Sequence, residues 1–181
     1  MTDEAAGDLD RRTRRTRAAI FDALIGLVFT RRYDAIRTGD LIAAAGVGRS
    51  TFYEHFRNKE DVLVAVIEPI FLPLAVAAAG RGSRAALRAT LEHLWEQRAL
   101  ARPLFEPPLV SRLQKKLAGM IEARLSPVDG GPPVRLIAMG AAAQQLAMLR
   151  MWLAGEASCS TDVLARQLLA RIPNDGPEPG A

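Results

Sequence analysis

The stretch that decides the fold runs from Thr38 to Leu63 and reads TGDLIAAAGVGRSTFYEHFRNKEDVL. It predicts a short helix over residues 39–45 that begins after Thr38, whose hydroxyl can cap the N–H groups of the first turn. Gly46 can adopt the left-handed conformation that ends a helix. A second short helix is expected over residues 49–56. Two short helices joined by a tight glycine turn form a helix-turn-helix.

Flanking helices are expected on both sides of this motif. Ile20 and Leu24 belong to an apolar face with helical spacing, which predicts a helix that ends near residues 31–33. On the other side, Asn58 is expected to cap a third helix, with Asp61 at the acidic position of a capping box. The first of these helices and the two of the motif predict a three-helix domain, which the helix after Asn58 connects to the rest of the chain.

The second short helix has the residue types of a recognition helix. In a helix-turn-helix this helix enters the major groove, and its N-terminal residues contact base edges. Arg49, Ser50 and Thr51 begin it, where the free N–H groups and the positive end of the helix dipole attract anions. Tyr53 and His55 can donate hydrogen bonds to phosphates. The helix therefore predicts a DNA contact.

The charge distribution agrees with this interpretation. The segment from Leu9 to Lys59 holds eleven Lys and Arg against five Asp and Glu, a net charge of +6, whereas the whole chain has +4. Such a concentration of positive charge favours a phosphate backbone as partner. Five arginines fall within Arg11–Arg17, and they are either an arm on DNA or a solvated leader.

Composition excludes several other classes of function. The chain has one cysteine, Cys159, and two histidines, His55 and His93, which are too few for a zinc site of the usual kind. No Cys–His or Ser–His pair is suggested, so we expect neither an enzyme nor a metal or cofactor site. Cys159 is either a redox sensor or a plain turn residue.

One segment, residues 62–79, has the length of a short membrane span and a single charge, Glu68. Pro69 and Pro73 interrupt it, which favours a buried helix over a transmembrane one. We therefore expect no membrane association.

The rest of the chain predicts an all-α fold. After Gly80–Ser83, helices are expected at residues 83–101, 108–125, 134–154 and 161–171, separated by proline and glycine. The predicted organisation is a disordered leader (1–10), a helix-turn-helix domain (11–58), a connecting helix (59–80), a helical regulatory and dimerisation domain (81–172) and a disordered tail (173–181).

The motif resembles the DNA-binding domain of TetR-type bacterial transcriptional regulators, whose pattern is approximately I-A-x-x-A-G-V-S-x-x-T-x-Y-x-H-F-x-x-K-x-x-L. The resemblance covers residues 11–67. Gly48 stands where the family usually has a capping Ser, and Ile42 where Ala is commoner. The matching residues are Leu41-Ile42, Ala45-Gly46-Val47-Gly48, Thr51-Phe52-Tyr53, His55-Phe56, Lys59 and Val62-Leu63.

The resemblance implies roles for individual residues. Arg49, Ser50 and Thr51 are the candidates for base edges, and an Arg there can hydrogen-bond guanine. Phosphate contacts are expected from the other four candidates, which are Thr38, Tyr53, His55 and Lys59.

For the second half of the chain, the resemblance implies dimerisation and effector binding. We expect helices 134–153 and 161–171 to form a four-helix contact between two copies, although the run of alanines could instead be monomer core. An effector would be mostly apolar, because the candidate lining is apolar. The candidate lining residues, each of which is otherwise plain core, are Phe71, Trp95, Phe105, Leu113, Met120, Met139 and Gln144.

The sequence thus indicates a cytoplasmic (bacterial nucleoid) homodimeric repressor that binds a palindromic operator in double-stranded DNA. Two alternatives stay open: a regulator that needs no ligand, and a helical interaction protein that no longer binds DNA. The operator, the regulated genes, the ligand and the sign of regulation do not follow from the sequence.

Overall fold

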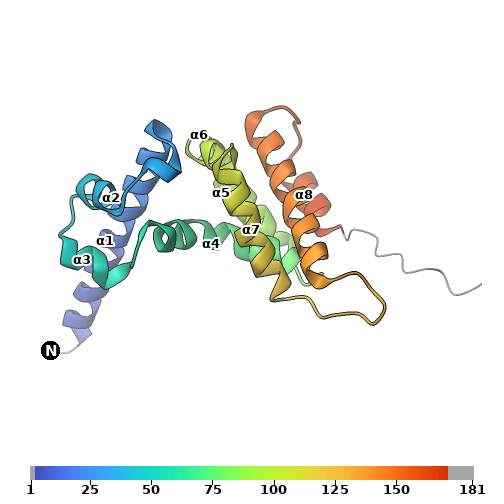
Figure 1. Cartoon of the computed structure of the whole chain (residues 1–181), viewed down its shortest axis with the longest axis horizontal. Coiled ribbons are helices and arrows are strands. Elements are labelled where there is room, and N and C mark those ends of the chain that lie inside the picture. The colour runs from blue at the N-terminus through green and yellow to red at the C-terminus, as the bar shows by residue number, and fades with distance from the viewer. Residues whose placement is uncertain (1–2, 171–181) are drawn as a thin grey trace, which may run out of the picture. The chain divides into compact units, whose positions relative to one another are not determined.

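The computed structural model describes residues 3–170, and its side chains are described from residue 11 onward. Within these residues every regular element is helical, which confirms the predicted all-α fold (Figure 1). The chain forms two compact units, Met1–Glu68 and Pro69–Ala181. The boundary between them falls inside the helix that the sequence predicted as a connection.

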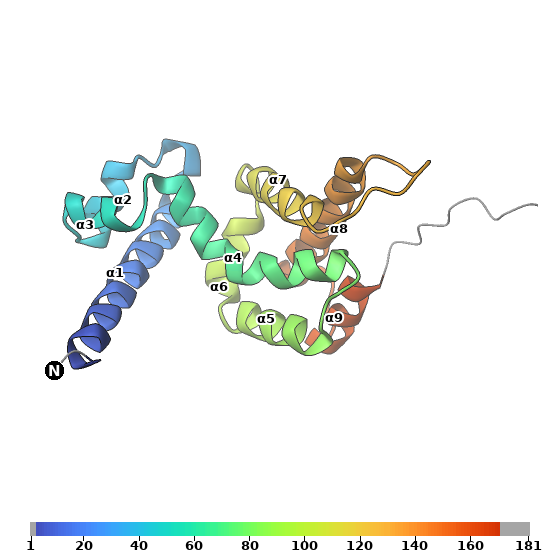
Figure 2. The ribbon, with the colours of Figure 1, turned by 90° about the horizontal axis from the view of Figure 1, so that it is seen from below.

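The first unit contains the predicted three-helix domain, α1 to α3, and the first half of α4, and α2 packs against α1 in it (Figure 2). Ile20, Leu24, Leu41 and Val62 are buried between the helices. Its elements are α1 (Asp3–Thr30), the 3-10 turn η1 (Tyr33–Ala35), α2 (Thr38–Ala45), α3 (Arg49–His55) and the first half of α4 (Lys59–Ala78).

Two helix starts in this unit differ from the prediction. Helix α1 begins at Asp3, so it extends across most of the residues expected to be a disordered leader; the alanines there favour a helix. The prediction that Thr38 caps α2 is wrong, because the N-cap is Arg37. The carboxylate of Asp40 accepts a hydrogen bond from the Arg37 backbone N–H at 2.9 Å, which fixes the helix start one residue earlier.

Other predicted helix signals are confirmed. Gly46 has φ of 63° and ends α2 in the left-handed region. Asn58 Oδ1 accepts a hydrogen bond from the Asp61 N–H at 2.9 Å and so caps α4. Both features depend on local chemistry, which is why the sequence predicts them.

The second unit is a helical bundle in which α7 packs against α8 and α5 against α9 (Figure 2). The helix expected over residues 83–101 is broken at Gln97, where the backbone leaves the helical region. The predicted tail, residues 173–181, lies outside the described residues. The elements after α4 are α5 (Arg84–Glu96), α6 (Arg98–Ala101), the 3-10 turn η2 (Arg102–Phe105), α7 (Leu109–Glu122), α8 (Val134–Ala154) and α9 (Thr161–Leu169).

Helices α4 and α8 are long and apolar enough to cross a membrane, judged by length and composition alone. The core helices of soluble proteins have the same character. Helix α4 buries Phe71 and Leu74, and α8 buries Leu146 and Leu149.

An ion pair fastens α5 to α9. The Arg84 guanidinium donates from Nε and Nη2 to the two carboxylate oxygens of Asp162, both at 2.8 Å. This hydrogen bonding lowers the pKa of Asp162 below its usual value. Ser83 and Ser160 cap the two helices that carry the pair, by accepting hydrogen bonds from Ala86 and Val163.

Gly82 lies where three segments approach closely. A Cβ at this position would be 2.6 Å from the Cα of Ala77 and 2.7 Å from Cδ2 of Leu169. Real Cβ atoms do not approach other atoms so closely, so only glycine fits between the end of α4 and α9.

Gly82→Ala should lower the free energy of unfolding by about 1–3 kcal/mol, the usual cost of inserting a methyl group into a packed site. Gly119→Ala is the matched control, because nothing lies within 4 Å of a Cβ there. In a helix interior this control should raise stability by about 0.5–1 kcal/mol. Urea unfolding followed by circular dichroism measures both, and equal stability of the two variants would contradict the close approach.

Candidate nucleic-acid interface

The turn between α2 and α3 presents the start of α3 to solvent. After Gly46, the chain passes through Gly48, which is the extended N-cap of α3 with φ of −65° and ψ of 148°. Arg49 and Ser50, the first two residues of α3, are exposed. The free N–H groups of a helix start and its positive dipole end therefore coincide with an arginine and a hydroxyl.

The opposite face of α3 is anchored by aromatic packing. Phe52 is fully buried, and Phe56 is buried just beyond the helix. The ring of Phe56 lies 6.1 Å from that of Phe52 and 5.9 Å from that of Phe21 on α1. This packing orients α3, so that the residues between the two phenylalanines point away from the core.

The remaining predicted contacts on α3 lie on or beside its outer face. Tyr53 is 48% exposed, and its ring meets Phe52 edge-on at 5.5 Å. Thr51 and His55 are half-buried, and the His55 ring lies 6.4 Å from that of Phe56. The exposed residues of this helix are thus Arg49, Ser50, Tyr53 and Glu54, with Thr51 and His55 half-buried at its edges.

The arginine run near the N-terminus is divided between two environments. Arg17 has its guanidinium carbon 4.9 Å from the Phe56 ring centre and 5.4 Å from that of Phe21, a cation–π arrangement. Arg11, Arg12 and Arg15 are exposed on the same helix, α1. Arg17 therefore belongs to the packing under α3, which the sequence analysis missed.

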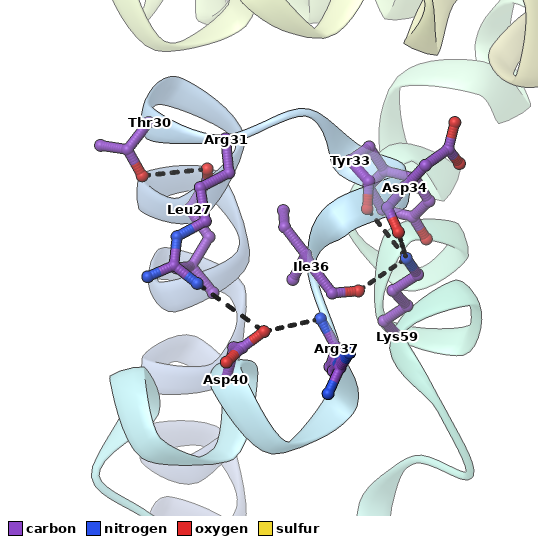
Figure 3. Close-up of polar contacts among 9 residues, drawn as sticks. All are labelled: Leu27, Thr30, Arg31, Tyr33, Asp34, Ile36, Arg37, Asp40 and Lys59. Atoms are coloured by element: carbon purple, nitrogen blue, oxygen red, sulfur yellow. Dashed lines mark hydrogen bonds and ion pairs between the residues drawn. The ribbon is translucent and has the colours of Figure 1, made fainter.

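The ammonium group of Lys59 is held inside the unit, as Figure 3 shows. Its Nζ donates to the carbonyl oxygens of Ile36 at 2.7 Å, Tyr33 at 2.8 Å and Asp34 at 3.4 Å. It also lies 4.5 Å from the centre of the Tyr33 ring. These three carbonyls match the three donors of an ammonium group, so Lys59 ties the first residue of α4 to the η1 turn.

The carboxylate of Asp40 contacts the residues on both sides of the η1 turn. Besides capping the Arg37 N–H, its carboxylate lies 3.7 Å from Nη1 of Arg31 (Figure 3). Thr38, predicted as a phosphate contact, is half-buried at the first position of α2 beside this group. Asp40 lies in the first turn of α2, where an acidic side chain is favourable.

The residues predicted to line an effector pocket are mostly dispersed. Phe71, Phe105 and Leu113 are fully buried core residues. Trp95 is partly exposed, and its ring is 4.7 Å from that of Trp152. Met120 and Met139 are half-buried, and Gln114 Nε2 lies 3.4 Å from the sulfur of Met139.

Gln144, the seventh candidate, lines a cavity of about 440 Å³. The lining of this cavity, which we call the α8–α9 cavity, includes none of the other six. Its walls are the C-terminal end of α4, the connection from α7 to α8, and residues of α8 and α9. Across the described part of the chain, His, Cys, Asp and Glu nowhere form a group of three that could hold a metal ion.

The first unit is thus a helix-turn-helix domain whose second helix, α3, begins with an exposed arginine. Residues 20–66 match the sequence model of "Bacterial regulatory proteins, tetR family". This match confirms the resemblance that the motif indicates: residues 20–66 are similar to the N-terminal domain of TetR-family regulators.

Comparison with individual proteins gives the same result. The regulator EthR of Mycolicibacterium smegmatis is 40% identical over 53 residues, which are 29% of this chain and 24% of that protein. An uncharacterized HTH-type regulator of Bacillus subtilis, YxbF, is 33% identical over 66 residues, or 36% and 17% of the two chains. The chain therefore spans about a fifth of these relatives.

A solved structure matches over nearly the whole length. A TetR transcriptional regulator from Streptococcus agalactiae is 27% identical, with a TM-score of 0.52, and the match covers 91% of this chain and 97% of that one. The fold of the second unit is therefore shared with this regulator.

Replacing Lys59 by Met should lower the free energy of unfolding by about 1.5–3 kcal/mol, which is typical of hydrogen bonds to a charged group. Arg57→Met is the matched control, because it removes the same charge from an exposed side chain two residues away. Thermal unfolding compares the two. If both variants unfold at the wild-type temperature, the contacts of Lys59 do not stabilise the unit.

Proposed function

We propose that this protein is a sequence-specific regulator of transcription, a repressor that binds a palindromic operator as a homodimer and is released by a small apolar ligand in the cytoplasm. The observation that carries the proposal is the geometry of α3. Its buried phenylalanines fix the helix while Arg49, Ser50 and Tyr53 stand exposed on its outer face.

The exposed groups suit both kinds of DNA contact. Arg49 can donate two hydrogen bonds to O6 and N7 of a guanine, which reads sequence. The Tyr53 hydroxyl and the His55 ring can donate to phosphates, which fixes the register of the protein on the duplex. Exposed arginines on α1 add charge that attracts the backbone without regard to sequence.

A dimer is supported by the surface of the second unit. On α8, Leu136 is 65% and Met151 is 40% exposed, and Val163 on α9 is 44% exposed. Gly140 and Ala147 are exposed between the first two and would let a second helix approach closely. A single recognition helix reads only a few base pairs, so two symmetric copies would match a palindrome.

Fluorescence anisotropy with duplexes from the region upstream of the gene tests the DNA-binding part. One duplex should bind at least about a thousandfold more tightly than random DNA. Arg49→Ala should cost about 1–3 kcal/mol and relax the preference at one base pair. Weak binding to every duplex regardless of sequence, lost by ~200 mM salt, would instead favour the alternative of a helical interaction protein that no longer binds DNA.

The Lys59→Met variant sharpens the same titration. Because the ammonium group is bound inside the unit, the variant should weaken binding without changing the slope of log K against log salt. Loss of a phosphate contact would instead reduce that slope by about 0.9. Arg57→Met is the control for the loss of a nearby positive charge. If only Lys59→Met reduces the slope, the Lys59 ammonium leaves the backbone carbonyls and binds phosphate, contrary to this expectation.

The dimer is tested by sedimentation velocity. The wild-type protein should be a dimer at micromolar concentration, and Ala147→Glu, which buries a charge in the proposed contact, should give a monomer. Ala89→Glu on α5, also an exposed alanine, should leave the dimer intact. A monomeric wild-type protein would overturn this part of the proposal.

A further inference from the structure

The N-terminal half of α1 carries a dense group of positive charges. Arg11, Arg12, Arg14 and Arg15 are all exposed, and no acidic residue lies between Arg11 and Asp22. Among the side chains of residues 11–170, three of these arginines take part in no ion pair. These three, Arg11, Arg12 and Arg15, are called the α1 arginine face below.

This clustering is unfavourable for the helix by itself. Arg11 and Arg15 are four residues apart, and Arg12 and Arg15 are three apart, so each pair lies side by side on the helix surface. Like charges at these spacings repel each other and destabilise the helix. A bound polyanion would remove this repulsion, so the arrangement favours a partner with closely spaced negative charges.

Arg17 fixes the position of the α1 arginine face relative to the recognition helix. Its guanidinium carbon lies 4.9 Å from the ring centre of Phe56, the C-cap residue of α3. At about 1.5 Å of rise per residue, Arg15 and Arg11 lie roughly 3 and 9 Å further along the axis of α1. The first turns of α1 extend beyond α3 at the same end of this unit (Figures 1 and 2).

Double-stranded DNA is the polyanion that fits this position. A duplex carries one negative charge per about 1.7 Å of its axis, so its phosphates continue on both sides of the bases that α3 would contact. The guanidinium group of arginine presents its N–H donors in a planar fork that matches the oxygens of a phosphate. Exposed arginines beyond α3 are therefore suited to the backbone next to those bases.

We propose that the α1 arginine face binds the phosphate backbone of double-stranded DNA outside the base pairs that α3 reads. Contacts of this kind hold the flanking duplex regardless of its sequence. The inference deepens the proposed function and rests on it, because the base contacts of α3 define where the flank begins. Each copy of the protein then covers more DNA than its recognition helix reads.

A salt titration with a random-sequence duplex tests the face without an operator. The triple variant Arg11→Gln, Arg12→Gln and Arg15→Gln introduces a good helix former and leaves Arg17 in place. Loss of three phosphate contacts should reduce the slope of log K against log salt by about 2.7, at about 0.9 per contact. Between about 50 and 200 mM salt, the affinity of the wild-type protein should therefore fall about fortyfold more than that of the variant.

The matched control removes three positive charges from another helix. Arg112→Gln, Lys115→Gln and Lys116→Gln change three exposed residues of α7. This control has the same net charge as the first variant but should keep the wild-type slope. Circular dichroism checks that both variants are folded. Equal reductions of the slope in both would mean that net charge alone attracts the duplex, and would overturn the proposal.

Tethered cleavage locates the contact on an operator duplex. Iron–EDTA is attached to Arg14→Cys, an exposed position that leaves the α1 arginine face intact, after Cys159→Ser has removed the native thiol. The hydroxyl radicals should cut the backbone outside the base pair whose preference Arg49→Ala relaxes. The same reagent on Ala89→Cys, an exposed position of α5, is the control and should give no cuts there.

Two further results would overturn the proposal: an unchanged salt slope in the triple variant, and cleavage from position 14 no stronger than from the control. If the triple variant loses binding to phosphatidylglycerol vesicles while its slope on DNA stays at the wild-type value, the face contacts a membrane instead. The random duplex requires no operator. Failure to find an operator is therefore distinguishable from failure of the α1 arginine face.

Discussion

The position of the η1 turn in the first unit depends on the half-buried ammonium group of Lys59. The free N–H groups at the start of a helix carry partial positive charge. A cation at the first position of α4 is therefore unfavourable by itself. Three backbone carbonyls from residues 33–36 compensate by accepting from it. The η1 turn therefore has to stay beside α4, and α2, which begins two residues after Ile36, is placed with it.

Local chemistry made much of the first unit predictable. Gly46 and Asn58 act within a few residues of their own positions, so the spacing of the sequence is enough to predict them. The buried pair Phe52 and Phe56 follows equally from the helical period. The start of α2 was misplaced because the N-cap is Arg37, a residue type that seldom caps helices, whose backbone N–H is bound by the Asp40 carboxylate.

Contacts between residues far apart in the chain could not be predicted from the sequence. Lys59 meets carbonyls 23–26 residues away, and Arg17 meets the ring of Phe56; backbone carbonyls have no sequence signature at all. Six of the predicted pocket residues do not line the α8–α9 cavity, for a related reason. Large apolar side chains such as Phe71 and Phe105 fill the core, so the cavity lies where alanine and glycine leave space.

The adjacent glutamines of α8 show why a buried hydrogen bond cannot be assigned to one residue from the sequence alone. Gln144 and Gln145 are identical in type, and both face the cavity, but only Gln145 is buried and bonded to α4. Neighbouring residues on a helix point about 100° apart, so one can lie in the core while the next is half-exposed. A sequence that places an amide within an apolar helix predicts a buried hydrogen bond somewhere along it. Which amide makes that bond depends on where a distant carbonyl, here that of Leu74, lies in the folded chain.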